Sequence, residues 1–335
     1  MVKISNVSYD DTKGSSRLEF DINGSEIDYT VINTLRRTIL TDIPIYAFTH
    51  FKINKNSSVF HNNFLKNQMK NMPVWGIENT MDYYEEHINK VDMNDEIEEM
   101  EDNVELTVDK KVDSTSLNQV TMYVDYENKS NEIESVTTDK AKFYFAQKQI
   151  ENPYDTPIQL VKLQPKQQIN FSIITSIGIE KESAIFSPVS ICVYDQKVDK
   201  KGVVLDNEFR FILESRGQIS EKRILKVAHL NIIKKLNAIL NQIINREDKE
   251  DKKDDEGEVE INNEDHTIGN LLSHGLQAHK NVQFSGYYMP HPLEKRVIIS
   301  YKLKSGNFKN ILKTVIEDFI EVFNKIDKEV NSMKT

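Results

Sequence analysis

The sequence predicts an α+β fold made of two copies of one unit in a single chain, with a mainly β domain inserted into the first copy. The first observation is a repeated motif: "DYTVINTLRRTIL" and "EDHTIGNLLSHGLQ" align Thr30 with Thr267 and Asn33 with Asn270. The second is the same order of predicted strands and helices around both motifs. The third is a change to Asn-, Asp- and Glu-rich sequence across 51–168. A single repeat at this separation indicates duplication of a unit rather than a solenoid.

The first copy is predicted to begin with two strands and a helix. Residues 1–24 alternate apolar and polar side chains, as strands joined by a turn do. A helix follows, with Asp28 or Thr30 as its cap, and Pro44 ends it. Its apolar stripe, which predicts one buried face, contains Ile32, Leu35 and Ile39.

The segment 51–168 is predicted to be an inserted domain with short strands. Within it, residues 78–103 are rich in carboxylates, which favours a solvated loop over a cation site. Their irregular spacing does not match an EF-hand loop, which also needs a central Gly. A metal-dependent enzyme that uses this acidic segment stays open as an alternative.

Residues 169–245 are predicted to complete the first domain, together with residues 1–50. Strand-forming residues dominate up to Gly217, and Ser220 can then cap a long helix. The stripe of this helix contains Leu225, Ala228, Ile232, Leu236, Ile239 and Ile243, and requires a partner along most of its length. Its lysines are predicted to form the solvated face: Lys222, Lys226, Lys234 and Lys235.

Residues 246–258 are highly charged and predict a linker, and residues 259–335 predict a second domain. About a dozen extended residues can span roughly 40 Å. The last helix carries the stripe Leu312, Val315, Phe319, Val322 and Ile326. Two such helices can bury their stripes against each other in a pseudo-symmetric dimer. Pairing within one chain or between chains is possible, and tethering favours the former.

Composition argues against several classes of protein. The net charge of -10 and the pI near 5.4 disfavour a surface that grips nucleic acid directly. Cys192 is the only cysteine, so neither an intrachain disulfide nor a cysteine zinc cage can form. No apolar run approaches the ~20 residues that cross a bilayer, and the N-terminus lacks the apolar core of a signal peptide. We expect no membrane contact.

Both repeated motifs resemble the HTLGNALRR signature of the alpha subunit of bacterial RNA polymerase. Residues 1–245 resemble the archaeal D or eukaryotic third-largest subunit, and residues 259–335 resemble the smaller archaeal L type, equivalent to the eukaryotic eleventh subunit. Further similar stretches are "HNNFLKNQMKNMPVWGI", "AIFSPVSICVY", "FRFILESRGQI" and "FSGYYMPHPLEKRVII". The motifs keep the family order in both halves. Fusion of the two subunits resembles the arrangement in large DNA viruses that transcribe in the host cytoplasm.

Two departures from the family change what the resemblance implies. Many eukaryotic relatives hold zinc with four cysteines in the insert, and this region has none, so neither zinc nor any other cofactor is expected. Ile32 stands where the family has Gly in the first helix. We therefore expect the paired helices to approach less closely there than at Gly269.

The resemblance implies a non-catalytic platform on which the two largest RNA polymerase subunits assemble. A small alpha-associated subunit is a further expected partner, and nucleic acid is contacted only indirectly, through the complex. Arg36 and Arg37 are expected to reach the large subunits, because guanidinium groups suit carboxylates and backbone carbonyls. Asn33 is assigned to the same contact, and Asn33 and Asn270 are each expected to bridge nearby backbone groups.

The resemblance also assigns an interface and a turn. The pseudo-dimer interface is expected to contain Ile32, Leu35, Ile39, Leu225, Ile232, Leu236, Ile239, Ile268, Leu272, Leu312, Val315, Phe319 and Val322. A rigid structural turn is expected at Gly286, Pro290, His291 and Pro292. A lone His without a second ligand favours a packed turn residue over a metal ligand.

A free-standing binding protein that reuses the dimer fold is the main alternative. It predicts a soluble monomer without large partners. The expected location is a viral factory in the host cytoplasm and the virion if the chain is viral, and the nucleus otherwise.

Overall fold

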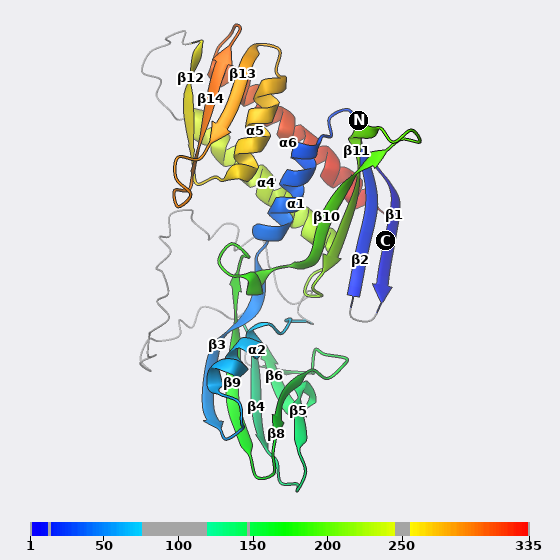
Figure 1. The fold of residues 1–335 in the computed structure, drawn as a ribbon, viewed down its shortest axis with the longest axis vertical. Helices are drawn as coiled ribbons and strands as arrows, with labels where there is room; N and C mark the ends of the chain where they lie inside the picture. The colour runs from blue at the N-terminus through cyan, green and yellow to red at the C-terminus, as the bar shows by residue number, and fades with distance from the viewer. Residues whose placement is uncertain (1, 13–14, 76–118, 146–147, 245–254, 334–335) are drawn as a thin grey trace. The chain divides into compact units, whose positions relative to one another are not determined.

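The computed structural model describes residues 2–12, 15–75, 119–145, 148–244 and 255–333 (Figure 1). They form two compact units, each with its own sheets. The first unit contains residues 1–43 and 188–335, and the second contains residues 44–187. The described part of the chain has the predicted α+β fold.

A four-stranded antiparallel sheet begins the first unit. Its strands are β1 (Lys3–Thr12), β2 (Ser15–Asn23), β10 (Val189–Val198) and β11 (Val204–Ser215), in the order β1-β2-β11-β10. Alternating residues bury one face, where the rings of Phe20 and Phe211 stack with centroids 5.4 Å apart. Two helices belong to this half, α1 (Tyr29–Thr41) and α4 (Glu221–Ile244).

The second half of the first unit repeats this plan with fewer strands. Its strands are β12 (Glu256–Asn262), β13 (Val282–Tyr288) and β14 (Arg296–Leu303), in the order β12-β14-β13. Its helices are α5 (His266–Ala278) and α6 (Phe308–Ser332). Each half thus has a short helix before a β-hairpin and a long helix after it. β12 already begins at Glu256, so the predicted linker 246–258 overlaps a strand, and residues 245–254 lie outside the described residues.

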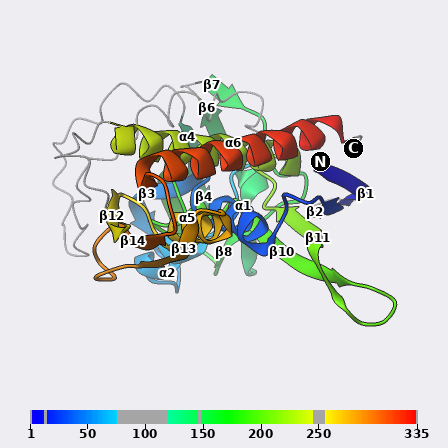
Figure 2. The ribbon, with the colours of Figure 1, turned by 90° about the horizontal axis from the view of Figure 1, so that it is seen from above.

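Four helices bring the two halves together. The long helices α4 and α6 run side by side, and the short helices α1 and α5 also pack on one another (Figure 2). His229 of α4 lies 3.0 Å from the amide oxygen of Asn324 on α6, at the edge of the apolar contact. The apolar stripes of the long helices are therefore covered by a partner from the same chain.

The second unit is mainly β. Its larger sheet has the order β3-β9-β4-β6-β7, and β5 pairs with β8. The elements are β3 (Ile45–Asn56), α2 (Asn62–Lys70), β4 (Val120–Glu127), β5 (Glu134–Thr137), β6 (Ala141–Phe145), β7 (Lys148–Ile150), β8 (Gln159–Leu163) and β9 (Gln168–Gly178). The unit extends beyond the predicted insert 51–168 at both ends, because β3 and β9 pair from Ile45↔Gly178 to Asn56↔Ile169. The acidic stretch 78–103 lies outside the described residues.

The glycine of the repeated motif serves packing within one half. A Cβ built on Gly269 would lie 2.6 Å from the ring of Tyr287 on β13 and 2.8 Å from Val297 on β14. The expectation that Gly269 lets the paired helices approach is therefore wrong, since the glycine lets α5 settle on its own sheet. Ile32, at the equivalent position of α1, is fully buried.

Replacing Leu236 tests the packing of the long helices. Leu236 of α4 is fully buried, whereas the next residue, Asn237, is exposed. We predict that Leu236→Ala lowers the free energy of unfolding by about 2–5 kcal/mol, because it leaves a cavity in a close-packed core. Asn237→Ala on the same helix should stay within about 0.5 kcal/mol of the parent. Equal unfolding midpoints in a denaturant titration of the two variants would contradict this packing.

Candidate functional site

Both short helices begin in the same way, with an aspartate at the N-cap. Asp28 accepts hydrogen bonds from the backbone N–H groups of Thr30, at 2.8 Å, and Val31, at 3.0 Å. Asp265 accepts one from the N–H of Thr267, at 2.8 Å. The cap of α1 is thus Asp28, which decides between the two predicted residues. The repeated motif encodes this local geometry twice.

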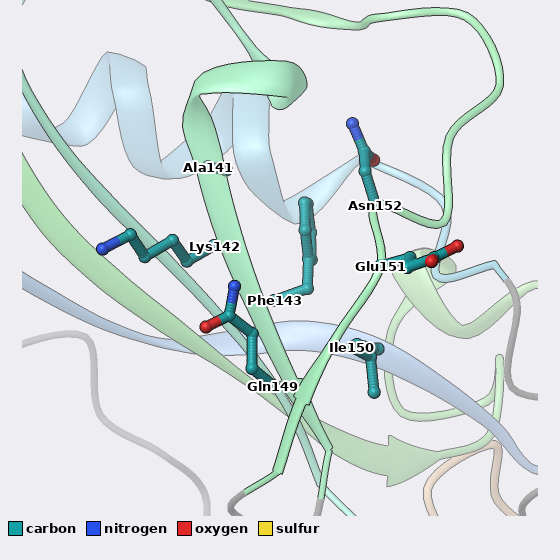
Figure 3. A pocket seen from close by; sticks show the side chains of 7 residues that line it. All are labelled: Ala141, Lys142, Phe143, Gln149, Ile150, Glu151 and Asn152. Atoms are coloured by element: carbon teal, nitrogen blue, oxygen red, sulfur yellow. The ribbon is translucent and has the colours of Figure 1, made fainter.

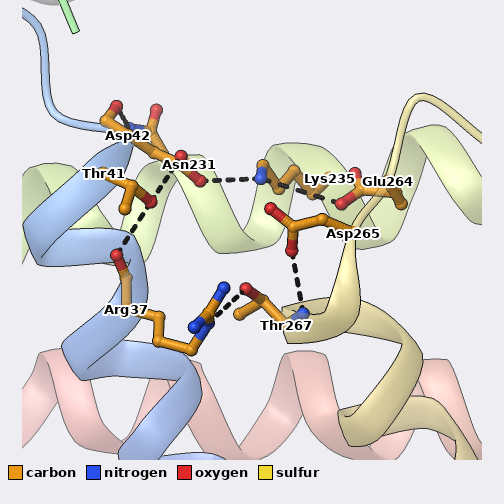
Figure 4. Close-up of polar contacts among 8 residues, drawn as sticks. All are labelled: Arg37, Thr41, Asp42, Asn231, Lys235, Glu264, Asp265 and Thr267. Carbon is orange, nitrogen blue, oxygen red and sulfur yellow. Dashed lines mark hydrogen bonds and ion pairs between the residues drawn. The ribbon is translucent and has the colours of Figure 1, made fainter. Parts of the chain in front are cut away.

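The two short helices make reciprocal contacts across the halves. The Nε of Arg37 on α1 donates to the Oγ1 of Thr267 at the start of α5, at 2.8 Å (Figure 4). His274 of α5 places its Nδ1 3.3 Å from a carboxylate oxygen of Asp28, the cap of α1. Arg37 and His274 hold equivalent positions in the repeat. This is the pattern of a two-fold interface, in which each side presents the same surface to the other.

A lysine with 20% of its side chain exposed lies among acidic residues from both halves. The Nζ of Lys235 on α4 lies 2.7 Å from Asp42, the C-cap of α1, and 3.7 Å from Glu264, just before α5 (Figure 4). Asn231, one turn earlier on α4, donates to the backbone carbonyl of Asp42 at 2.8 Å. Burial alone would lower the pKa of Lys235, but the negative charges of Glu264 and Asp42 outweigh it and raise that pKa.

The predicted solvated lysine face of α4 is therefore wrong for one member. Lys226 and Lys234 are exposed as expected, whereas Lys235 points into the interface. Lys222 is half-buried and donates to the backbone carbonyl of Met333, at 2.5 Å. Helical periodicity places Lys234 opposite the apolar stripe and Lys235 near its boundary, where the pattern alone does not decide whether a long side chain is buried. The nearby acidic residues are distant in sequence.

The three residues assigned to a large-subunit contact lie on α1. The Nε of Arg36 donates to the amide oxygen of Asn33, at 3.2 Å. Asn33 therefore bonds to a side chain and not to the expected backbone group. Arg36 and Asn33 are half-buried. Arg37, which was expected to reach the large subunits, is also half-buried and donates a hydrogen bond to Thr267 of the second half. Tyr29, at the start of the same helix, is 47% exposed.

All thirteen apolar residues assigned to the pseudo-dimer interface are buried. None has more than 9% of its surface exposed. Seven belong to the first half and lie on α1 or α4, and six belong to the second half and lie on α5 or α6: Ile32, Leu35, Ile39, Leu225, Ile232, Leu236 and Ile239, then Ile268, Leu272, Leu312, Val315, Phe319 and Val322.

The predicted structural turn is shorter than expected. Gly286 lies inside β13, opposite Ser300 of β14, so its assignment to the turn is wrong. Pro290, His291 and Pro292 do lie in the β13–β14 connection, and all three are exposed. The Nδ1 of His291 accepts a hydrogen bond from the N–H of Leu293, at 3.2 Å, which is a turn contact.

Among the described residues, no group of three or more His, Cys, Asp or Glu side chains is arranged to hold a metal ion. In the second unit, a shallow depression beside β6 and β7 is lined by Ala141, Lys142, Phe143, Gln149, Ile150, Glu151 and Asn152 (Figure 3). Its side chains do not form a catalytic constellation. None of the described helices combines the length and apolar character that a bilayer crossing needs.

Two segments of the chain match one protein family. Residues 19–236 and, separately, residues 256–329 match the RNA polymerase Rpb3/Rpb11 dimerisation domain. The matched segments contain the two short helices and most of the two long helices. The predicted resemblance is thereby confirmed for both halves.

Similar proteins come from a virus, an archaeon and an animal. A protein of Acanthamoeba polyphaga mimivirus, named as a DNA-directed RNA polymerase subunit, is 24% identical over 325 residues, covering 93% of this chain and 89% of the viral protein. This chain is 48% identical to Rpo11 of Saccharolobus solfataricus over 63 residues, which cover 18% of this chain and 67% of Rpo11. Subunit RPAC2 of RNA polymerases I and III of Caenorhabditis elegans is 39% identical over 64 residues, 19% of this chain and 44% of RPAC2.

Replacing Lys235 tests the polar contact between the halves. We predict that Lys235→Met lowers the free energy of unfolding by about 3–5 kcal/mol, because buried carboxylates lose their cation. A group whose folded pKa is raised contributes stability below its unfolded pKa, and loses it only as the pH rises through the folded value. The loss should therefore be constant between about pH 6 and 9.

Lys234→Met is the matched control for this prediction, because Lys234 is the exposed neighbour of Lys235 on α4. Its unfolding midpoint should equal that of the parent in urea at each pH. A Lys235→Met protein as stable as this control would show that the lysine does not join the halves.

Proposed function

The chain belongs to the RNA polymerase Rpb3/Rpb11 dimerisation domain family, and from this premise we propose that it is a non-catalytic assembly subunit of a multisubunit DNA-directed RNA polymerase. In this role it docks the two largest subunits for transcription. Its partners include other polymerase subunits, with a small alpha-associated subunit among them. It meets nucleic acid only through the complex.

The pairing of both family domains in one chain carries this proposal. In the structure, α1 packs on α5 and α4 packs on α6, so two segments that match the dimerisation domain pair within one polypeptide. The thirteen apolar residues assigned to the pseudo-dimer interface are all buried, which supports this proposal. A preassembled pair needs no second copy before it can bind larger subunits.

The outer face of α1 is the proposed contact with a large subunit. Tyr29, Asn33 and Arg36 are spaced four and three residues apart, which places them on one side of the helix, opposite the buried Val31 and Leu35. Asn33 orients the guanidinium of Arg36 through its 3.2 Å hydrogen bond. A guanidinium held in this way can bind a carboxylate or a carbonyl of a partner at low entropic cost. Arg37 supports the face indirectly, because it ties α1 to Thr267.

The assembly role suggests where the protein acts. We propose a viral factory in the host cytoplasm and the virion for a viral chain, in line with the similarity to a mimivirus protein, and the nucleus otherwise. The direct test is affinity purification of the tagged protein from its native source, with mass spectrometry of what survives a salt wash. Two much larger chains in about equal amount support the proposal. Their absence favours a free-standing binding protein.

Replacing Arg36 tests the assigned contact. Arg36→Ala removes a side chain whose hydrogen bond lies within its own helix, so the unfolding midpoint should stay close to that of the parent. We predict that retention of the large partners falls about tenfold, which corresponds to loss of about 1.4 kcal/mol of binding. Lys226→Ala, an exposed cation on α4, should retain them fully. Equal retention by both variants would place the contact elsewhere.

A further inference from the structure

The duplicated motif makes positions in the two halves comparable. Asp28 and Asp265 are both N-caps and both precede a Thr by two positions. The residue just before each cap is therefore equivalent in the two halves. In the first half it is Ile27, and in the second half it is Glu264. An apolar side chain and a carboxylate thus occupy the same place in the repeat.

The long helices can be compared in the same way. Both contain the tripeptide Ile-Leu-Lys, at 224–226 in α4 and at 311–313 in α6. Counting from these tripeptides, Lys235 of α4 is equivalent to Val322 of α6. The repeat therefore makes Val322 and Ile27 the positions that correspond to Lys235 and Glu264, and it relates two sites on the paired halves.

The first site is ionic. Glu264 is 4% exposed, and its carboxylate lies 3.7 Å from the Nζ of Lys235. Asp42 of the first half lies 2.7 Å from the same nitrogen. The lysine thus receives one carboxylate from each half. The carboxylate of Glu264 comes only from the second half, because the equivalent residue of the first half is Ile27.

The second site is apolar. Ile27 is 1% exposed and Val322 is 8% exposed. This turn of α6 lies beside the segment before α1, because Lys325 forms a 2.7 Å ion pair with Glu26. That pair is about one-third exposed on each side, so solvent screens it. The buried residues of this site carry no charge.

We propose that the Lys235–Glu264 pair makes the two halves pair with each other and reject pairing with a second copy of themselves. If two first halves paired, each Lys235 would meet Ile27 in place of Glu264. If two second halves paired, each Glu264 would meet Val322. Two second halves would bury Glu264 against an apolar side chain, and two first halves would leave Lys235 with Asp42 of its own half but without its second carboxylate. The correct pair gives Lys235 both carboxylates and keeps the equivalent positions Val322 and Ile27 apolar.

This selection concerns the protein alone and requires no polymerase partner. It decides which half can dock on which. A first half can pair only with a second half, whether that second half belongs to the same chain or to another copy. Because the two sites differ, the charges at one site distinguish the correct pair of halves from the wrong pairs, although the other contacts of the interface are nearly symmetric. The proposal goes beyond assembly of a polymerase and can fail while that function stands.

The test uses the whole protein with a protease site placed within residues 246–254. Two preparations carry different tags on the first half, are cut, unfolded together in urea and refolded. In the parent protein, affinity capture through one tag should recover the second half and should recover no first half that carries the other tag. The double variant Lys235→Val with Glu264→Ile should also recover the other first half, at least about tenfold above the parent. Exclusive pairing of the correct halves in this variant would overturn the proposal.

Stability of the uncut variants distinguishes selection from a general loss of folding. Lys235→Val and Glu264→Ile each leave one buried charge without its cross-half partner, so each should lower the urea midpoint. The double variant should be more stable than Lys235→Val, because no Glu264 carboxylate lacks its cross-half cation, but less stable than the parent, because Asp42 still lacks Lys235. A double variant that is less stable than both single variants, or that fails to refold, would contradict the proposal. The control double variant Lys325→Ala with Glu26→Ala, at the exposed pair, should pair as the parent does.

Discussion

The mutual burial of the apolar stripes of α4 and α6 is the constraint on which the first unit depends. Leu225, Ile232 and Leu236 on one helix, and Leu312 and Phe319 on the other, are all buried, and the two helices pack side by side. Apolar surface removed from water contributes about 25 cal/mol per Å². Separating the halves would expose the apolar surface of α4 and α6 to water. The arrangement of the two sheets and the two short helices therefore depends on this contact.

The polar contacts at this interface give the pairing its geometry. Arg37 reaches Thr267, and His274 reaches Asp28, so each short helix contacts the N-terminal end of the other. The contact of Lys235 with Glu264 has no equivalent on the other side, where the related buried residues are apolar. Burial of apolar surface supplies most of the attraction between the halves. These few polar contacts restrict which surfaces can pair.

The elements that are encoded locally could be predicted from the sequence. The stripes of the four helices, the Asp caps and the α+β order around both motifs follow from residues within a few positions of one another. Lys235 could not be placed correctly, because its carboxylates come from Asp42 and Glu264, which are far apart in sequence. The role of Gly269 was misjudged for the same reason, since its close neighbour Tyr287 lies on a strand outside the motif.

One measurement tests the central claim that a single chain supplies the complete paired platform. It is native mass spectrometry of the assembly purified from its source through the tagged chain. We expect a mass that contains one copy of this protein together with one copy of each of two much larger subunits. A complex with two copies of the chain would contradict pairing within one polypeptide, and a mass without large partners would contradict the assembly role.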